Sequence, residues 1–521
     1  MASRKNARTI CFFACVLCAL SFNCWMSAQI PYTHDDWNWG IAAGLRHLLA
    51  ADINSRYAGN FLVILLTRSP ALKALVMGSV FTAIPLLGTE LALTCTGAGA
   101  GGPLRSGALR LVLFLTGFLF FLLCRDALWA QTSGWVSGFS NFVMSGLLLL
   151  LFYRIVYAGL SDGAPKRASA TAACFFFGVL IQLFLENLSL YFLGFSLGSV
   201  LLCAARRRKS TALAAILAGT IVGAALMFSS GIYRSLWQTG AAVDQYRQIV
   251  LPRGAGLPAM ISSVAGRLWG EFLPQLPTWS GLFSAVVCLL LAVYLIRERN
   301  LSEKRSAAEL LLCAANVILA LCFLYTYLFF RHREADEIAG LPGRRALLAL
   351  ALLYLILISF ELVLLFRTQR RIFVWILVFW FSPYLILAPL LIVNTVGPRS
   401  FYTGQLCELM LILTLIALLW RDGPGRLQPS AAVCCALCAL LLALYWVRIY
   451  AAIGSVKRER DAALASARDG KSACISLPAY PYRQYLWIPD PVNNEFLRDF
   501  RAFYGVPEDV ELIFEQKPPS A

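Results

Sequence analysis

The chain has 521 residues, of which 59% are hydrophobic and 14% are charged. A soluble globular protein averages about 25% charged and about 45–50% apolar residues, so this composition excludes an ordinary soluble domain. The formal net charge of +17 does not indicate nucleic-acid binding, because Lys and Arg gather in short loops between apolar runs, as they do in proteins that cross a membrane. We therefore expect a polytopic membrane protein with a lipid bilayer as a partner and no nucleic-acid partner.

Apolar runs of about 20 residues, the length that crosses a bilayer, recur along the chain. We expect about 13 transmembrane helices, at 9–28, 60–88, 107–124, 139–160, 168–186, 188–205, 211–229, 280–296, 307–330, 345–366, 371–393, 402–420 and 430–452. No clear cleavage site follows the first run, so we read it as a helix and not as a signal peptide. Pro70 is expected to break or kink the second helix. The predicted fold class is an all-α polytopic transmembrane bundle.

Basic loops predict the orientation of this bundle. They include the first residues of the chain, “RRRK” at 206–209 and “RTQRR” at 367–371. Such loops stay in the cytoplasm, so we expect a cytoplasmic N-terminus and an outer C-terminus. The loop at 331–345 does not fit this scheme, because it is rich in Arg although the scheme places it outside. The predicted number of helices is least certain there.

Two regions follow from this topology. Residues 1–454 form the transmembrane domain, with outer loops at 29–59 and 230–279, and residues 455–521 form a small outer α/β domain. In the first outer loop, “GIAAGLRHLLAA” has the spacing of a helix lying in the membrane interface. In the tail, “SACISLP” and “YRQYLWIP” predict strands, and “NEFLRDFRAFYG” predicts an amphipathic helix.

The stretch “THDDWNWG” at 33–40 contains two adjacent carboxylates beside a predicted membrane edge. Two close acids do not both ionise freely, so one pKa should rise, as suits a general base. Alternatively, Asp35 and Asp36 bind a divalent cation such as Mg²⁺ or Mn²⁺ through their oxygens, or they only keep a loop in water. Trp37 and Trp39 either stack on a sugar ring or anchor the chain at the interface.

Three arginines fall at the same predicted outer depth, namely Arg56, Arg234 and Arg399. A guanidinium group binds phosphate through a two-pronged set of donors. A single arginine at this depth more often reaches for lipid headgroups, but three beside a carboxylate pair favour a site. Asn141 and Glu186 are further polar residues at the outer ends of predicted helices.

The order of “HDDWNWG”, “NSRYAGN”, “SGWVSGFSNFV”, “LEN” and “GPRSFY” resembles the bacterial polytopic glycosyltransferases of the GT-C superfamily, near those that glucosylate O-antigen. Those enzymes have an Asn-Gly-Arg-Tyr-like element, in which this chain has Ser55 in place of the Gly. They also have a Trp-x-x-Gly-x-x-Asn-Tyr-like element, in which this chain has Phe142 in place of the Tyr. The resemblance implies a GT-C-like fold in the inner membrane and inverting transfer of a sugar from a polyprenyl phosphate to a glycan or lipid acceptor on the periplasmic face.

Carried over by position, Asp35 or Asp36 would be the catalytic base, with Asp35 favoured, and the three arginines would hold the phosphate. The residues expected to contact substrate are His34, Trp37, Arg56, Asn141, Glu186, Arg234 and Arg399. A transporter or flippase, and a ligase or polymerase of lipid-linked glycans, remain as alternatives. Glu361 and Glu408, with Gln405 and Asn316, are the intramembrane polar residues that a transporter would use, and packed interhelical hydrogen bonds explain them equally well.

Overall fold

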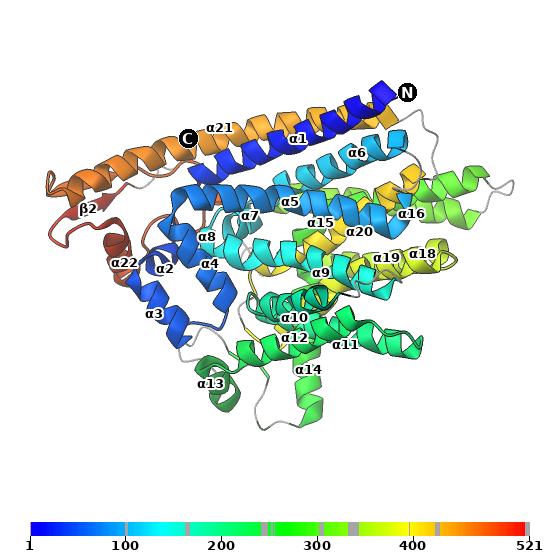
Figure 1. Ribbon diagram of the computed structural model, residues 1–521, viewed down its shortest axis with the longest axis horizontal. Helices are drawn as coiled ribbons and strands as arrows, with labels where there is room; N and C mark the ends of the chain where they lie inside the picture. Colours follow the sequence, from blue (N-terminus) through cyan, green and yellow to red (C-terminus); the bar gives the residue numbers. More distant parts are fainter. Residues whose placement is uncertain are drawn as a thin grey trace.

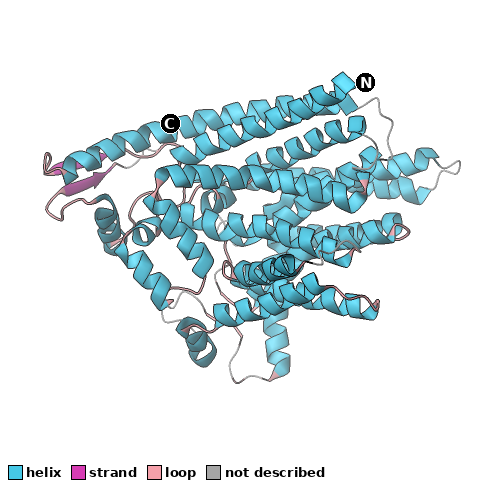
Figure 2. Cartoon of the chain, viewed as in Figure 1, coloured by secondary structure: helices cyan, strands magenta, loops and turns pink. Residues whose placement is uncertain are grey.

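A computed structural model of the chain describes residues 2–98, 103–161, 167–240, 248–251, 254, 256–301, 307–331, 343–394, 396–421 and 428–515. Figure 2 shows that nearly all of them are helical, with two strands at one end of the molecule. The longer helices are α1 (Ala2–Gln29), α5 (Pro70–Thr96), α6 (Pro103–Leu122), α9 (Met144–Leu160), α10 (Ala168–Gln182), α11 (Glu186–Ala205), α12 (Thr211–Phe228), α15 (Leu273–Leu301), α16 (Ala307–Phe330), α18 (Arg344–Phe366), α19 (Arg370–Leu387), α20 (Tyr402–Arg421) and α21 (Gln428–Arg468).

Among the described residues, 11 helices are long and apolar enough to cross a membrane. A twelfth span arises if α6 and α7 (Asp126–Thr132), which meet at 93°, count as one broken span. At 15 residues, α10 is shorter than the ~20 that a bilayer needs. Every predicted span lies in helical structure, which confirms the all-α multi-pass class, whereas the count of about 13 remains a prediction. Most of the Arg-rich loop at 331–345, namely residues 332–342, lies outside the described residues.

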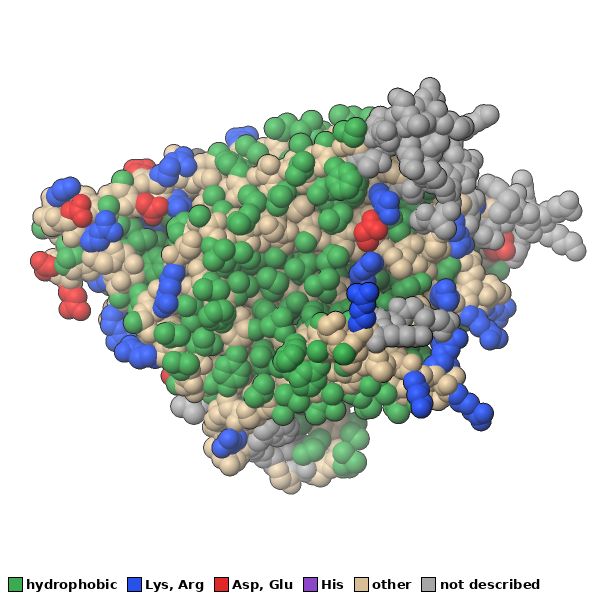
Figure 3. Space-filling model, in the orientation of Figure 1, with side chains coloured by type: hydrophobic (Ala, Val, Ile, Leu, Met, Phe, Trp, Pro, Cys, Tyr) green, Lys and Arg blue, Asp and Glu red, His purple; other side chains and the backbone are tan. Residues whose placement is uncertain are grey.

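The surface is divided as a membrane-spanning bundle requires. On the face in Figure 3, hydrophobic side chains fill a broad central band, and Lys, Arg, Asp and Glu lie mainly toward its two ends. The long helices run roughly parallel to one another across this band (Figure 1), with α1 beside α21. Apolar side chains that face outward over such a band match the hydrocarbon of a bilayer.

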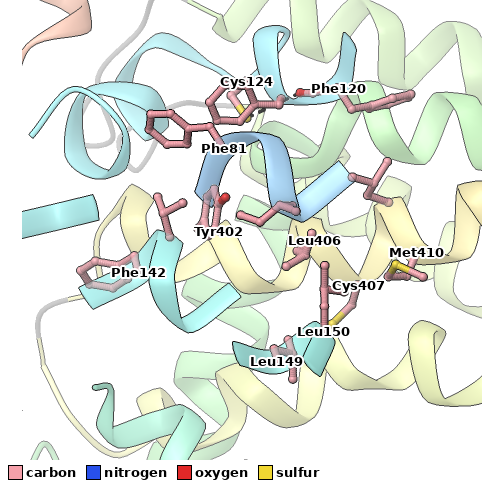
Figure 4. Close-up of a cluster of buried hydrophobic side chains, with 14 of the residues drawn as sticks. Phe81, Phe120, Cys124, Phe142, Leu149, Leu150, Tyr402, Leu406, Cys407 and Met410 are labelled. Atoms are coloured by element: carbon pink, nitrogen blue, oxygen red, sulfur yellow. Dashed lines mark hydrogen bonds between the residues drawn. The ribbon is translucent and has the colours of Figure 1, made fainter. Parts of the chain in front are cut away.

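Helix α20 is the centre of the packing. It contacts α5, α6, α9, α15 and α19, and most of its side chains are buried because these neighbours surround it. Figure 4 shows part of this core, which includes Tyr402, Leu406 and Met410 of α20, Phe81 of α5 and Leu149 of α9. This rigid centre fixes the ends of the helices that surround it.

The second predicted span is two helices. Helix α4 (Tyr57–Arg68) ends before Ser69, whose side chain accepts a hydrogen bond from Leu72 N at 3.3 Å and caps α5, with Pro70 at its first position. The predicted break at Pro70 is confirmed. Two short helices, α2 (Asp36–Gly40) and α3 (Ala42–Ala50), precede α4 and confirm the helix predicted in the first loop.

The C-terminal residues form a small α/β cap (residues 471–515). Strands β1 (Cys474–Leu477) and β2 (Glu511–Phe514) pair in parallel, and α22 (Asn494–Tyr504) lies between them in sequence. The predicted first strand and amphipathic helix are confirmed. The strand predicted in “YRQYLWIP” is wrong, because that stretch makes a 3-10 turn, η6 (Arg483–Tyr485), and the second strand comes later. Helix α21 continues through position 454 to Arg468.

The cap and the helices of the first loop share one end of the bundle, which we call the cap end (Figure 1). Asn38 of α2 donates a hydrogen bond to Asp499 of α22 at 2.9 Å. Gly40 approaches α22 so closely that a Cβ would lie 2.2 Å from the ring of Phe503. Residues 461 positions apart in the chain are thereby held together, and the functional residues predicted in the first loop lie under the cap.

Candidate functional site

A cavity of about 440 Å³ lies at the cap end. Its wall combines segments that are distant in the sequence: the turn before α2, the start of α4, the start of α11, α13 (Gly231–Thr239), the segment at 389–400 and the cap. The polar and aromatic lining residues are His34, Asp35, Trp39, Asn54, Arg56, Asn60, Trp135, Ser137, Asn141, Phe142, Glu186, Asn187, Phe228, Tyr233, Asn394, Arg399, Ser400 and Trp487. Six of the predicted site residues therefore share one cavity.

Asp35 lies in the turn that starts α2 and faces the cavity. Its Oδ1 accepts a hydrogen bond from Nε1 of Trp135 at 3.0 Å and lies 3.6 Å from Nδ1 of His34. About a third of its side chain is exposed, so a carboxylate oxygen can reach a ligand. The backbone of His34 has φ of 51°, a left-handed conformation that is strained in residues other than glycine and often marks functional sites.

Asp36 has a different environment, because it is fully buried and does not line the cavity. Its Oδ1 accepts hydrogen bonds from the N–H and the hydroxyl of Ser137, at 2.9 and 2.7 Å. Its Oδ2 accepts from the N–H groups of Thr33 at 3.1 Å and Val136 at 3.4 Å. Burial and the adjacent charge of Asp35 raise the pKa of the Asp36 carboxyl, while these hydrogen bonds lower it. Asp36 thus ties the first loop to residues 136–137.

Arg56 and Glu186 form a two-pronged ion pair across the cavity wall. Nε of Arg56 lies 3.0 Å and Nη2 2.7 Å from Oε2 of Glu186, and both side chains are about four-fifths buried. Tyr233 of α13 donates a hydrogen bond to the same carboxylate. Glu186 begins α11, where a negative charge is favoured by the helix dipole. The Glu186 carboxylate therefore orients the guanidinium of Arg56.

Arg399 reaches the same cavity from the segment between α19 and α20. Its guanidinium carbon lies 5.6 Å from the ring centre of Trp135 and 5.7 Å from that of Phe142. The guanidinium of Arg56 is 5.9 Å from the same Phe142 ring. Two of the three predicted arginines therefore gather around one aromatic ring, and Glu186 balances the charge of one of them, Arg56.

Asn141 and Phe142 belong to a five-residue π-helix, η2 (Phe139–Val143), at the start of α9. Such wide turns inside helices occur frequently at functional sites. Nδ2 of Asn141 donates to Ser137 O at 2.9 Å, while its Oδ1 is buried without a hydrogen-bond partner. Nδ1 of His34 and Nε1 of Trp487 are in the same state. Buried polar atoms are seldom left unpaired, so these three atoms are exceptions in the packing around the cavity.

Two predicted substrate-binding residues are not in the cavity. Trp37 is fully buried, donates its Nε1–H to Tyr32 O at 3.1 Å and packs edge-on against Phe500 at 5.2 Å, so its role here is to attach the cap. Arg234 is exposed. It follows Tyr233 in α13, and a helix turns by roughly 100° per residue, so Tyr233 faces the cavity and Arg234 does not.

The described residues contain no group of three or more His, Cys, Asp and Glu side chains that could hold a metal ion. Moreover, both oxygens of Asp36 already accept hydrogen bonds from protein donors. Joint chelation by Asp35 and Asp36 would break those bonds, so the geometry does not support the cation alternative and separates the two aspartates by position.

Several lining residues were not predicted as site residues. Tyr233 directly precedes the predicted Arg234, and Trp135 lies six positions before the predicted Asn141. The sequence does not show which of Tyr233 and Arg234 faces the cavity. Ser137 could have been found as a small polar residue in the Trp-x-x-Gly element. Trp487 carries no local signal at all, because only the folding of the cap onto α2 brings it to the cavity.

Comparison of the chain with known protein families, curated proteins and solved structures finds no match.

Proposed function

We propose that the protein is an integral-membrane glycosyltransferase of the GT-C type, which moves a sugar from a polyprenyl-phosphate donor to a glycan or lipid acceptor with inversion. The observation that carries this proposal is that a cavity containing charged side chains and an apolar groove meet. The cavity holds Asp35, Arg56 and Arg399, and the groove begins at Leu190 and Pro389, which also line the cavity. A lipid-linked phosphate has the same two parts, a polar head and a long apolar tail.

The groove has a volume of about 550 Å³ and is lined by α11, α19 and the end of α9, without a charged residue. It follows α11 from Leu190 to Leu202, which is roughly 18 Å at 1.5 Å per residue. Leu190 and Leu385 are exposed beside it, so the groove opens on the apolar outside of the bundle. A Cβ added to Gly198 would meet nothing within 4 Å. A prenyl chain can therefore enter it from the bilayer.

The cavity supplies groups suited to the transfer step. Asp35 takes the proton of the acceptor hydroxyl as the acceptor oxygen attacks the anomeric carbon. The bond from that carbon to the phosphate oxygen breaks, and its electron pair leaves with the polyprenyl phosphate. Arg399 and the Glu186-oriented Arg56 stabilise the negative charge that grows on this phosphate. Asp36 holds the loop that presents Asp35.

We place this reaction on the periplasmic face of a bacterial inner membrane. The proposal takes the cap end as the outer end, as the basic loops predict. A cavity at the membrane surface suits a donor whose tail stays in the bilayer while its sugar meets a water-borne or lipid-borne acceptor. The acceptor is a component of the cell envelope, such as a lipopolysaccharide glycan.

A flippase for lipid-linked glycans is the second candidate. Its support is Glu361, which is fully buried in α18 and accepts a hydrogen bond from Asn316 of α16 at 2.7 Å. This pair does not line the cavity or the groove. An interhelical hydrogen bond of this kind also serves packing in a membrane. The joined cavity and groove therefore favour transfer.

Binding of tritiated polyprenyl phosphate to the purified protein in nanodiscs tests the substrate class. We expect saturable binding that a polyprenyl-phosphate sugar displaces and that neither inorganic phosphate nor polyprenol displaces at the same concentration, because each has only one of the two recognised parts. Equal displacement by polyprenol would show that the arginines do not recognise the phosphate and would contradict the proposal.

A further inference from the structure

An aromatic wall (His34, Trp135 and Trp487) covers one side of the cavity. Its three rings come from the first loop, the loop after α7 and the cap. The ring centre of Trp135 lies 5.8 Å from that of His34 and 6.2 Å from that of Trp487, and His34 lies 6.2 Å from Trp487. Trp135 is buried, and the ring of His34 also packs against Phe496 at 4.6 Å, whereas Trp487 is half-buried and keeps part of its ring accessible to a ligand.

Close backbone contacts fix the aromatic wall. A Cβ on Gly134, the residue before Trp135, would lie 2.0 Å from Tyr485 O, so only glycine lets the cap approach here. Ile488, the residue after Trp487, has φ of 41°, which is an outlier for a β-branched residue. Like the left-handed backbone of His34, this strain must be held by the surrounding packing. The wall is therefore built from constrained positions.

The wall is on the side of the cavity where Asp35 lies. Trp135 donates its Nε1–H to Asp35, and His34 is the neighbouring residue. Phe142 is the ring that both arginines approach, and Arg399 also lies 5.6 Å from the ring centre of Trp135, so Trp135 borders both sides of the cavity. In an inverting transfer the acceptor hydroxyl attacks from the face opposite the leaving phosphate. The rings beside Asp35 consequently face the acceptor, and the ring between the arginines faces the sugar donor.

We infer that the aromatic wall is a binding site for a pyranose ring of the acceptor, so that the acceptor is a glycan, and that the C-terminal cap supplies a substrate-contacting residue, Trp487. One face of a pyranose presents C–H groups with partial positive charge, which the electron-rich faces of indole rings attract. The wall is bordered by one negative and one positive side chain, Asp35 and Arg399, as suits a sugar without net charge. This inference rests on the proposed function and narrows the class of acceptor from a glycan or lipid to a glycan.

Saturation-transfer NMR with methyl glycosides of glucose, galactose and N-acetylglucosamine, and full-length protein in nanodiscs, tests the wall directly. We expect the protein to transfer saturation to the ring C–H protons of at least one glycoside. We expect Trp487→Ala to abolish this saturation transfer. Trp269→Ala is the matched control, since Trp269 is half-exposed and does not line the cavity. Trp487→Leu, which keeps bulk without an aromatic face, gives the same test should Trp487→Ala fail to fold.

Kinetics separate this inference from the proposed function. With a glycan acceptor, Trp487→Ala should raise the KM for the acceptor about tenfold and leave the KM for the sugar donor unchanged, and Trp487→Phe should restore most of the loss. Sugar transfer with no saturation of any glycoside, or with an unchanged acceptor KM in Trp487→Ala, would overturn the inference alone. Absence of transfer to every acceptor would overturn the proposed function.

Discussion

The two adjacent aspartates should respond in opposite ways to the same substitution. In Asp35→Asn the amide oxygen still accepts the single hydrogen bond from Trp135, so the free energy of unfolding should change by less than about 0.5 kcal/mol. Proton acceptance is lost, however, and sugar transfer should fall roughly 10²- to 10⁴-fold. In Asp36→Asn the amide oxygen can keep both bonds from Ser137, but the amide N–H₂ then faces the N–H groups of Thr33 and Val136.

Each buried donor left without an acceptor costs about 1–3 kcal/mol, so Asp36→Asn should lower the stability by several times the change in Asp35→Asn. Thermal unfolding in one detergent, followed by a transfer assay at a temperature where both variants are folded, measures the two effects separately. Ser137→Ala is a matched control, because it removes one of the four bonds to Asp36 and leaves Asp35 intact. A stable, fully active Asp35→Asn, or an Asp36→Asn as stable as the wild type, would refute these assignments.

Four further outcomes are expected. Arg399→Lys should weaken binding of polyprenyl phosphate by about 1.5–3 kcal/mol, roughly 10- to 150-fold, because the two-pronged contact is lost, whereas Arg234→Lys, outside the cavity, should bind normally; equal losses would contradict the cavity assignment. Gly198→Leu should fill the groove and abolish binding of a long-chain polyprenyl phosphate in the nanodisc assay, with Gly198→Ala near normal. The raised pKa of Asp36 means that the folded state holds a proton that the unfolded state releases. The stability contributed by this protonation is fully present below the ordinary pKa of 3.8 and is lost as pH rises through the folded-state pKa. Thermal unfolding from pH 4 to 8 should show this decline in the wild type, and Asp36→Asn should flatten it. An impermeant maleimide should label the exposed Cys474 in intact spheroplasts and not in the Cys474→Ser variant; labelling only after lysis would reverse the predicted orientation.

Local sequence features account for much of the fold. Apolar run length predicted the spanning helices, because the bilayer fixes how many residues a helix needs. The break at Pro70 follows from a missing N–H and a fixed φ, both local properties. The stretch 483–488 resisted prediction because its alternating aromatic and aliphatic residues read as a strand, while packing against α21 and residue 134 imposes a turn.

The candidate site was predicted where motif residues are themselves the lining residues, as for Asp35, Arg56 and Asn141. Prediction failed where the rotation of a residue around its helix, or packing between distant segments, determines whether the residue lines the cavity. Trp37 was predicted to bind substrate, but α2 turns it toward Phe500 of the cap, and Trp39 lines the cavity instead. No local pattern encodes a contact between residues more than 400 positions apart.

The central claim, sugar transfer in the cavity at the cap end, is tested most directly by proteoliposomes that contain a polyprenyl-phosphate sugar labelled with ³H in the sugar and ¹⁴C in the lipid, together with an envelope glycan acceptor. We predict that ³H appears in the acceptor while ¹⁴C stays in the membrane, and that Asp35→Asn abolishes this separation while the lipid still binds. Movement of both labels together across the bilayer, with none in the acceptor, would contradict the account and identify a translocator.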